Sequence, residues 1–393
     1  EQSDPAAWQP PRLAAGTIPV RGQAPAFEPT ILNHAYPEVR NPVSTPFQTL
    51  AYFQGVRACQ GYYPRYHPGF VSFEPLGTPY LQYGAGIIQT FGPDGKWQVR
   101  NLLTEVVEPY AREEMGYKSL EPGDNGAGNE TTIRWDRDGG MYLLVNISET
   151  NTNWPSRKAL LLYSPDGMKT WQVHVMPEYM LRFEKFVGHN PDCLNGPPVI
   201  LLSHYLSPTK ISLTVPEKQA DGTLLVPPPV PLAEDGVALI PHSGESNQAL
   251  THDGKVYLVY GRITVLPGHK KEDGVPAFAR TYDLKTKQLS EPVLIGFGGI
   301  NAEDDHNWPG LAADSRGILH VVINGHHDPF TYTRSVRPWD ISEWASSENV
   351  AAGTSYAGLV CDDQDTLYTV TRHSDPGYYF RLSLHRKPAG QPW

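Results

Sequence analysis

The segment Asn129-Glu-Thr-Thr-Ile-Arg-Trp-Asp-Arg-Asp-Gly-Gly-Met-Tyr-Leu-Leu-Val-Asn146 decides the fold class. It has a polar start, a short apolar strand, a tight Asp/Gly turn and a second strand rich in β-branched and aromatic residues. Apolar runs on both sides of an Asp-Gly turn are typical of β-hairpins. The same pattern returns in segments 245–262, 306–324 and 356–372. The chain is therefore built from a repeated hairpin unit.

The spacing of these units predicts how they assemble. A weaker copy begins near Asn195, where Pro197-Pro-Val-Ile-Leu-Leu-Ser203 supplies a strand, and two more are expected in the first 100 residues. Unit starts near 129, 195, 245, 306 and 356 are 50 to 66 residues apart, and 393 residues divided by seven gives about 56. Such units, with no helices between them, can hide their edges by closing radially. We predict an all-β fold, a seven-bladed β-propeller of four-stranded antiparallel blades, as a single domain over residues 1–393.

Two β-sandwiches in tandem are the alternative architecture, and they predict a linker near the middle of the chain. The candidate linker is Val226-Pro-Pro-Pro-Val-Pro231. Its flanks continue the same repeat, so we interpret it as a stiff loop between blades.

Composition and charge exclude several functions. The formal net charge is −10 and no basic run occurs, which disfavours nucleic acid as a partner. No stretch approaches 18 apolar residues, so we expect no membrane span. The chain starts at Glu1, as expected for a processed, secreted protein, and we expect a monomer. Cys59, Cys193 and Cys361 form an odd set without CxxC spacing, which predicts no disulfide framework.

The repeat also predicts where a site should lie. In a propeller blade, the loop before the first strand and the loop after the second strand open on the same mouth of the central channel. These positions are strongly polar, whereas positions kept only for packing would be apolar or small, so we expect a functional site there. Each residue also has a structural interpretation, such as capping a turn or packing in the core. The positions are Asn129, Glu130, Asn146, Asn195, His204, Glu245, Asn247, Arg262, His306, Asn307, His326, His327, Tyr356, Arg372 and His373.

Two N-glycosylation sequons, Asn129-Glu-Thr131 and Asn146-Ile-Ser148, are compatible with export. They fall at the predicted mouth, where a glycan would obstruct substrate. Either they are unmodified or the register of that blade is misassigned.

Two consecutive segments resemble a known family. The run from Asp305-His306-Asn307-Trp308-Pro309 through Asp314 and His320 to Gly325-His326-His327-Asp-Pro and Tyr332-Thr-Arg334-Ser335 is similar to the signature of the BNR-4 group of propeller proteins. The run from Thr354-Ser-Tyr356 to Thr371-Arg372-His373 and Phe380 resembles the next blade of the same signature. That group includes ulvan lyases and lyases that split rhamnose from glucuronate. In the ulvan lyases this pair of blades comes early in the chain, whereas here it closes the chain, as a cyclic permutation would allow.

The resemblance implies β-elimination within an acidic polysaccharide, with no cofactor required for the chemistry. Its catalytic spacing corresponds to His306 and His326, twenty residues apart, and to Tyr356 and Arg372, sixteen apart. A site for this reaction must neutralise the uronate carboxylate, remove the C5 proton and protonate the departing oxygen. Arg372 suits neutralisation because its planar fork meets a carboxylate bidentately. Tyr356 is the expected base, with His306 and His326 as carboxylate donors or an alternative base. The expected substrate-binding residues are Asn307, His327, Arg262, Glu245, Asn247, Glu130 and His373.

Two other functions remain open. The segment Pro165-Asp-Gly-Met-Lys-Thr-Trp-Gln-Val173, preceded by Ser164 and echoed by Pro93-Asp-Gly-Lys-Trp-Gln-Val99, resembles a degenerate Asp-box of the bacterial neuraminidase repeat. A sialidase-like hydrolase would use paired carboxylates, for which Glu130 and Glu245 are candidates, or a tyrosine nucleophile. A non-catalytic sugar-binding propeller would use aromatic platforms such as Trp308, although Trp308 is expected to pack between blades.

A structural metal is the remaining expectation. The resemblance implies structural calcium or zinc, and His189, Cys193 and His204 are mixed nitrogen and sulfur ligands that zinc accepts. Their spacing matches no zinc finger.

Overall fold

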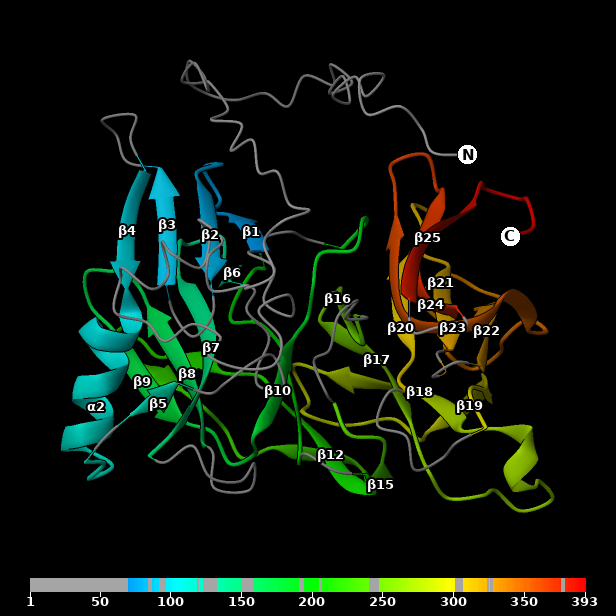
Figure 1. Ribbon diagram of the computed structural model, residues 1–393, viewed down its shortest axis with the longest axis horizontal. Helices are drawn as coiled ribbons and strands as arrows, with labels where there is room; N and C mark the ends of the chain where they lie inside the picture. The colour runs from blue at the N-terminus through cyan, green and yellow to red at the C-terminus, as the bar shows by residue number, and fades with distance from the viewer. Residues whose placement is uncertain are drawn as a thin grey trace.

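The computed structural model describes residues 70–393 apart from 84–86, 92–96, 119, 123–132, 150–157, 191–193, 205–206, 240–246, 301–306, 324, 326–327 and 376–378. These residues form antiparallel sheets with few helical turns, which confirms the all-β prediction. In Figure 1 the sheets follow one another in chain order around an arc, from β1–β4 to β20–β25.

The first three sheets are built from consecutive hairpins. The first contains β1 (Phe70–Phe73), β2 (Pro79–Tyr83), β3 (Ile87–Phe91) and β4 (Trp97–Asn101). The second contains β5 (Glu121–Pro122), β6 (Arg134–Trp135), β7 (Met141–Ser148), β8 (Lys158–Ser164) and β9 (Gln172–Val175). The third contains β10 (Met180–Phe183), β11 (Ile200–Ser203), β12 (Thr209–Thr214) and β15 (Val230–Gly236), beside a ribbon of β13 (Glu217–Lys218) and β14 (Leu224–Leu225).

The last two sheets contain the segment that decided the family resemblance. The fourth contains β16 (Ala249–His252), β17 (Lys255–Gly261), β18 (Pro276–Asp283) and β19 (Val293–Phe297). The fifth has six strands: β20 (Gly310–Ala313), β21 (Leu319–Ile323), β22 (Asp328–Arg334), β23 (Glu348–Cys361), β24 (Leu367–Asp375) and β25 (Tyr379–Lys387). The helical turns are η5 (Leu103–Val107), α2 (Glu108–Glu113) and η7 (Lys271–Asp273).

The hydrophobic cores lie between successive sheets. Strand β7 shows why: Tyr142 and Leu144 pack toward β10 and β11, whereas Leu143 and Val145 pack toward the first sheet and α2. Successive side chains of a strand point to opposite faces, so a strand apolar at every position is covered on both. Further cores join the third sheet to the fourth and the fourth to the fifth. A tandem pair of sandwiches would not give this continuous series, so the repeat is propeller-like in its packing.

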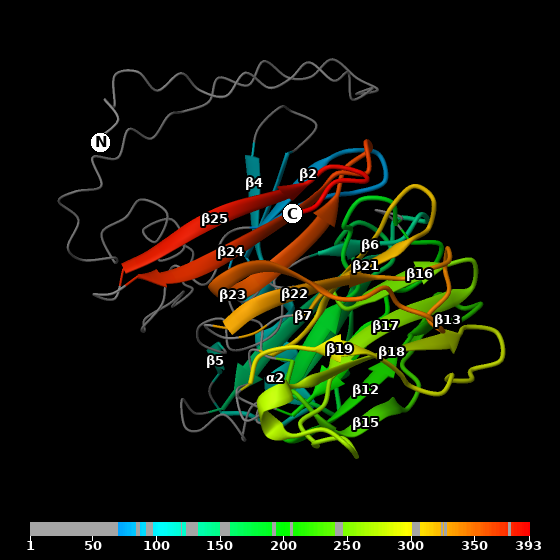
Figure 2. The same ribbon diagram turned by 90° about the vertical axis from the view of Figure 1, so that its right-hand side faces the viewer.

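Strand β23 explains why the last sheet has six strands. Its first half pairs with β22, at Phe330↔Ala351, and its second half pairs with β24, at Leu359↔Thr369. One long strand thus serves as the outer strand of one four-stranded unit and the inner strand of the next. In Figure 2 this strand lies beside β24 and β25. The described residues do not confirm the number of seven blades, which stays a prediction.

Two details of the predicted register were wrong. The proline run 226–231 is not a loop between blades, because it leads from the β13–β14 ribbon into β15, the fourth strand of the third sheet. The unit near Asn195 starts one strand earlier than expected: β10 is the first strand, and Pro197–Ser203 leads into the second. The four clear hairpins, by contrast, are confirmed as β6–β7, β16–β17, β20–β21 and β23–β24.

Candidate functional site

The first strands of successive sheets meet along an inner edge, as the convergence argument requires. Strand β20 contacts both β16 and β23. The Leu311 amide donates to the Asn247 carbonyl at 2.7 Å, and the Thr251 amide donates to Glu184 at 2.6 Å. These bonds join the third, fourth and fifth sheets. We call the residues Arg182, Glu184, Asn247, Gln248 and Trp308 the inner-edge cluster.

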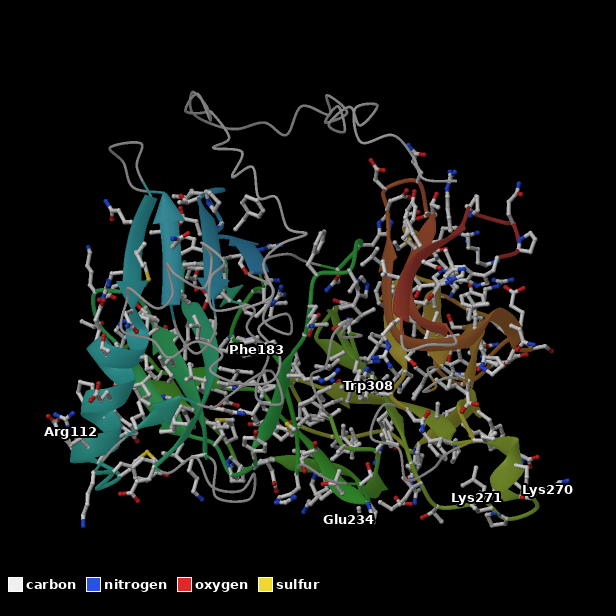
Figure 3. All side chains as sticks on the ribbon, in the orientation of Figure 1. Arg112, Phe183, Glu234, Lys270, Lys271 and Trp308 are labelled. Atoms are coloured by element: carbon white, nitrogen blue, oxygen red, sulfur yellow. The ribbon has the colours of Figure 1, made fainter. Side chains whose placement is uncertain are left out.

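The cluster is buried and closely packed around Arg182. The guanidinium carbon of Arg182 lies 4.7 Å from the ring centroid of Trp308, and its Nη1 lies 3.5 Å from Gln248 Oε1. Trp308 is fully buried, as expected, and Arg182 is 2% exposed. In Figure 3 Trp308 and Phe183, the neighbour of Arg182, lie in the interior, whereas Arg112 is at the periphery. The cation therefore holds Trp308, and with it the preceding residue Asn307, in one position.

Glu184 carries the buried carboxylate of the cluster. Its two oxygens accept hydrogen bonds from the Thr251 amide and hydroxyl, each at 2.6 Å. Burial raises the pKa of Glu184, and the hydrogen bonds from Thr251 and the charge of Arg134 oppose that rise. Arg134 is itself 4% exposed, and its Nε and Nη2 make no hydrogen bond with any residue that the structure describes.

Asn247, a predicted substrate ligand, is used to join segments. Its Oδ1 accepts from the Lys185 amide at 2.9 Å, and its Nδ2 donates to the Ala249 carbonyl at 2.7 Å. Both ends of the amide are thus occupied by backbone groups. Its substrate-binding role stays a prediction that would require these bonds to be exchanged.

Asn307 lies where the β19–β20 loop meets the β21–β22 loop. A Cβ added at Gly299 would lie 2.6 Å from Asn307 Oδ1 and 2.7 Å from Asp328 Oδ2, so only glycine fits between them. The same Cβ would lie 3.0 Å from Gly325 Cα. Because Gly325 and Asp328 flank His326 and His327, the ends of the histidine loop lie beside Asn307, although the two histidines are outside the described residues.

The β23–β24 hairpin positions the backbone of the predicted base beside the predicted neutraliser. Ser355 pairs with Arg372 and Thr354 with His373, so Tyr356 follows the direct partner of Arg372. The register shifts between Ser355 and Gly358, as at a β-bulge, a feature that re-aims side chains and recurs next to active sites. Arg372 is partly buried. The side chains of Tyr356 and His373 are outside the described set.

Arg262 and Asn146 are engaged in the framework. The Nε of Arg262 donates to Asp235 Oδ1 at 2.7 Å, and its guanidinium lies 5.4 Å from the Phe278 ring centroid. Asn146 is 5% exposed on β7. A glycan needs an accessible amide, so this sequon is not a modification site in the folded protein. Asn195 and His204 are exposed on either side of the second strand of their sheet, not around its first.

Other predicted residues lie outside the part of the chain that the structure describes. They are Asn129, Glu130, Cys193, Glu245 and His306, together with His326 and His327. Their roles stay predictions.

The loop after β10 brings His189 to the β23–β24 turn. His189 Nε2 is 3.2 Å from Asp365 Oδ1 and 2.8 Å from the Asp362 carbonyl, and the Cys361 thiol completes a group whose ligand atoms lie within 4.8 Å of one another. Burial raises the pKa of Cys361 to about 12. A zinc ion accepts this mixed donor set. This group shares only His189 with the predicted ligands His189, Cys193 and His204; His204 is exposed, Cys193 lies outside the described residues, and a metal site stays a prediction.

Residues missed by the sequence argument are Arg182 and Glu184. The sequence feature that could have revealed them is the apolar strand Met180-Leu-Arg-Phe183, in which Arg182 places a charge at the inner edge. It was overlooked because β10 joins β11 through a long segment and not through a tight Asp-Gly turn.

The Asp-box-like segment 164–173 forms a structural turn between β8 and β9. Asp166 accepts hydrogen bonds from the amides of Lys169 and Thr170 at 3.1 and 2.9 Å, and Ser164 Oγ accepts from the Met168 amide at 2.8 Å. These bonds fix the turn and leave it outside the inner-edge cluster.

Comparison with known proteins supports the resemblance. Residues 275–381 match the model of the BNR repeat-containing family. The chain is 24% identical over 161 residues to an ulvan lyase of Nonlabens ulvanivorans, covering 35% of this chain and 31% of that protein. It is 27% identical over 124 residues to an ulvan lyase of Alteromonas sp. (strain LOR), covering 26% and 25%. The chain thus spans less than a third of the length of these relatives.

Among solved structures, similar chains have lower identity. An ulvan lyase of family PL25 bound to -[GlcA(1-4)Rha3S]- superposes with a TM-score of 0.46 at 13% identity, over 84% of each chain. A Trypanosoma rangeli sialidase superposes with a TM-score of 0.40 at 8% identity, over 81% of this chain and 54% of that one. The resemblance inferred from the two C-terminal segments is confirmed: residues 275–381 match the BNR repeat-containing family model, and the chain is similar in part to ulvan lyases.

Proposed function

We propose that the protein is a polysaccharide lyase that cleaves a bond to a uronic acid by β-elimination, acting on a rhamnose-glucuronate linkage such as that of ulvan or gum arabic. The observation that carries the proposal is the β23–β24 register, which sets Tyr356 next to the partner of Arg372 within the matched segment. The direct partner of Arg372 is Ser355, and the register shift that follows Ser355 interrupts the regular alternation of side chains at Tyr356, so we propose that Tyr356 and Arg372 face one sugar ring. We also propose that it acts outside the cell as a monomer. No helix among the described residues is long and apolar enough to cross a membrane.

The chemistry assigns one task to each group. Arg372 pairs with the carboxylate and stabilises the charge that develops when the C5 proton leaves. Tyr356 removes that proton as a phenolate, which the neighbouring guanidinium favours because an opposite charge stabilises the ionised form. His306 and His326 lie in the loops on either side of the β20–β21 hairpin and donate to the carboxylate or serve as an alternative base. Tyr356, now a phenol, or a histidine then donates a proton to the departing O4, and the product is a 4,5-unsaturated uronate.

The geometry disfavours a binding module that uses Trp308 as a sugar platform. Trp308 has no exposed surface, so its ring is closed to a sugar. The Asp-box echo, which favoured a hydrolase, proves to be a turn that stabilises the outer strands.

The test detects the carbon–carbon double bond of the unsaturated uronate product. The protein is incubated with ulvan, gum arabic and a sialylated glycan while the ultraviolet absorbance of unsaturated uronate and the reducing ends are followed. We expect absorbance to rise with cleavage; reducing ends without absorbance would show a hydrolase, and neither signal with retention on a polysaccharide column would show a binding protein.

Matched variants assign the roles. Removing a catalytic base costs about 10²–10⁴-fold, and removing one preorganised charge donor about 10²–10³-fold. We expect Tyr356→Phe and Arg372→Ala to lower kcat by these factors. The controls are Tyr368→Phe, at the turn end of the same hairpin, and Arg386→Ala, which is exposed on β25. Full activity of Tyr356→Phe would remove that residue from the mechanism.

A further inference from the structure

A second polar cavity lies away from the inner edge. It has a volume of about 810 Å³ and is bounded by β21, β22 and β23 and by the segment 387–392. Its wall includes Asp314, which ends β20, whereas Asn307 precedes the same strand. Seven extended residues span roughly 20 Å, so the cavity lies at the opposite end of β20 from Asn307. Sites for small molecules commonly measure about 300–1,000 Å³.

Asp314, His320 and Tyr332 lie next to one another in the cavity wall, and His320 is hydrogen-bonded to Tyr332. His320 Nδ1 is 2.6 Å from the Tyr332 hydroxyl, and His320 Nε2 is 3.6 Å from Asp314 Oδ2. Burial lowers the pKa of His320 and raises that of Tyr332, so both are neutral near pH 7. In that state Tyr332 donates its proton to Nδ1, and its oxygen still has lone pairs for a sugar hydroxyl.

Most charges around the cavity are already paired. Arg316 Nη2 contacts Asp314 at 2.6 Å, Lys387 Nζ contacts Glu348 at 3.3 Å, and the Asp365 carboxylate accepts from the Ser315 amide and hydroxyl. The carboxylates of Asp314, Glu348 and Asp365 in the cavity wall are therefore already paired.

Arg334 is the exception. It is exposed and lines the cavity, and it lies two residues after Tyr332 on β22, so the two side chains share one face of the strand. It makes no side-chain hydrogen bond or ion pair with the residues that the structure describes. An unused guanidinium beside neutral polar groups suits a ligand with one carboxylate and several hydroxyls.

We propose that this cavity binds a uronate unit, with Arg334 pairing with the carboxylate and Tyr332 contacting a hydroxyl. The inference rests on the proposed function, because it gives an acidic polysaccharide a second contact outside the catalytic centre. Such a contact offsets the repulsion between an anionic polymer and a chain of net charge −10. It also raises affinity for polymers long enough to reach both sites.

Calorimetry with glucuronate tests the site, with glucose as the neutral probe, in Arg372→Ala protein so that the catalytic carboxylate contact is absent. We expect glucuronate to bind and glucose not to bind, and Arg334→Gln to weaken glucuronate binding at least tenfold. The matched control is Arg137→Gln, another exposed arginine whose side chain makes no hydrogen bond or ion pair with the described residues and which does not line the cavity. Trp393, whose ring is 5.5 Å from that of Tyr332, provides a fluorescence signal that local binding should change.

Two results would overturn the proposal: equal binding of glucose and glucuronate, or unchanged glucuronate affinity in Arg334→Gln. A lyase assay separates this failure from that of the proposed function. Glucuronate binding that depends on Arg334 in a protein without lyase activity supports the site and refutes the catalysis. Lyase activity without Arg334-dependent binding refutes the site alone. In an active enzyme, Arg334→Gln should raise KM for the polymer more than Arg137→Gln does.

Discussion

The contact between Arg182 and Trp308 should be measurable as a coupling energy. The guanidinium lies 4.7 Å from the ring centroid, inside the roughly 6 Å limit for cation–π attraction, and both side chains are at most 2% exposed. Such contacts contribute about 0.5–1 kcal/mol at exposed sites and about 2 kcal/mol when desolvated. We therefore expect a coupling free energy of about 1–2 kcal/mol between Arg182→Met and Trp308→Leu.

The assay is a double-mutant cycle by urea denaturation, followed by circular dichroism so that loss of a tryptophan does not change the probe. The contact of Arg182 with Gln248 is lost in both arms that carry Arg182→Met, so it cancels from the coupling. Arg112→Met with Trp308→Leu is the control cycle, because Arg112 is exposed on α2 and pairs with Glu108. We expect additivity there within about 0.5 kcal/mol.

A coupling below about 0.5 kcal/mol for the Arg182 cycle would refute the argument that the cation fixes Trp308. The same cycle can be read in the lyase assay. If Arg182 positions the segment that contains Asn307 and His306, both single variants should lower kcat by a similar factor and the double variant should add little.

Two further predictions concern the loops. Gly299→Ala forces a Cβ to 2.6 Å from Asn307 Oδ1, so we expect lyase activity to fall at least tenfold. Gly196→Ala, with open space around its Cβ, should leave activity unchanged, and equal activities of the two variants would contradict the packing of the β19–β20 loop against the β21–β22 loop. Burial alone would raise the pKa of Asp314, but hydrogen bonds from His320 and Arg316 hold it well below its usual value. The folded-state pKa is depressed, so the stabilisation is present above pH 4 and is lost as the pH falls below about 4. Asp314→Asn should therefore destabilise the protein by about 1.5–3 kcal/mol at pH 7, and the difference from wild type should shrink in urea titrations toward pH 3; a difference independent of pH would contradict the assignment.

The hairpins were predictable because their signal is local. Asp136, Asp253, Asp314 and Asp362 each begin a tight turn, and turn chemistry is specified by a few adjacent residues. Asp314 shows the physical basis, since its Oδ1 accepts from the amides of Arg316 and Ile318 across the turn. The register error near Asn195 arose where that local signal is absent.

The site was less predictable because its contacts join distant parts of the chain. Nothing in the neighbourhood of Arg182 specifies that its partner is Trp308, and Glu184 is satisfied by Thr251 on the next sheet. Asn247 lies at the inner edge, but the sequence cannot show that both ends of its amide bind backbone groups, and its role in substrate binding stays a prediction.

These occupied groups limit where substrate can bind. The side chains of Asn247 and Glu184 already make hydrogen bonds to neighbouring segments of the chain, and the guanidinium of Arg182 covers the ring of Trp308. A ligand carboxylate needs a cation that can be reached, and of the two predicted arginines Arg262 is held by Asp235. Arg372 is partly buried on a strand whose partner has a bulge at Tyr356, so the hairpin can aim both residues toward the same ligand without disturbing the core. The inner-edge cluster thus acts as a rigid support, and the proposed elimination chemistry would depend on the loops and the hairpin beside it.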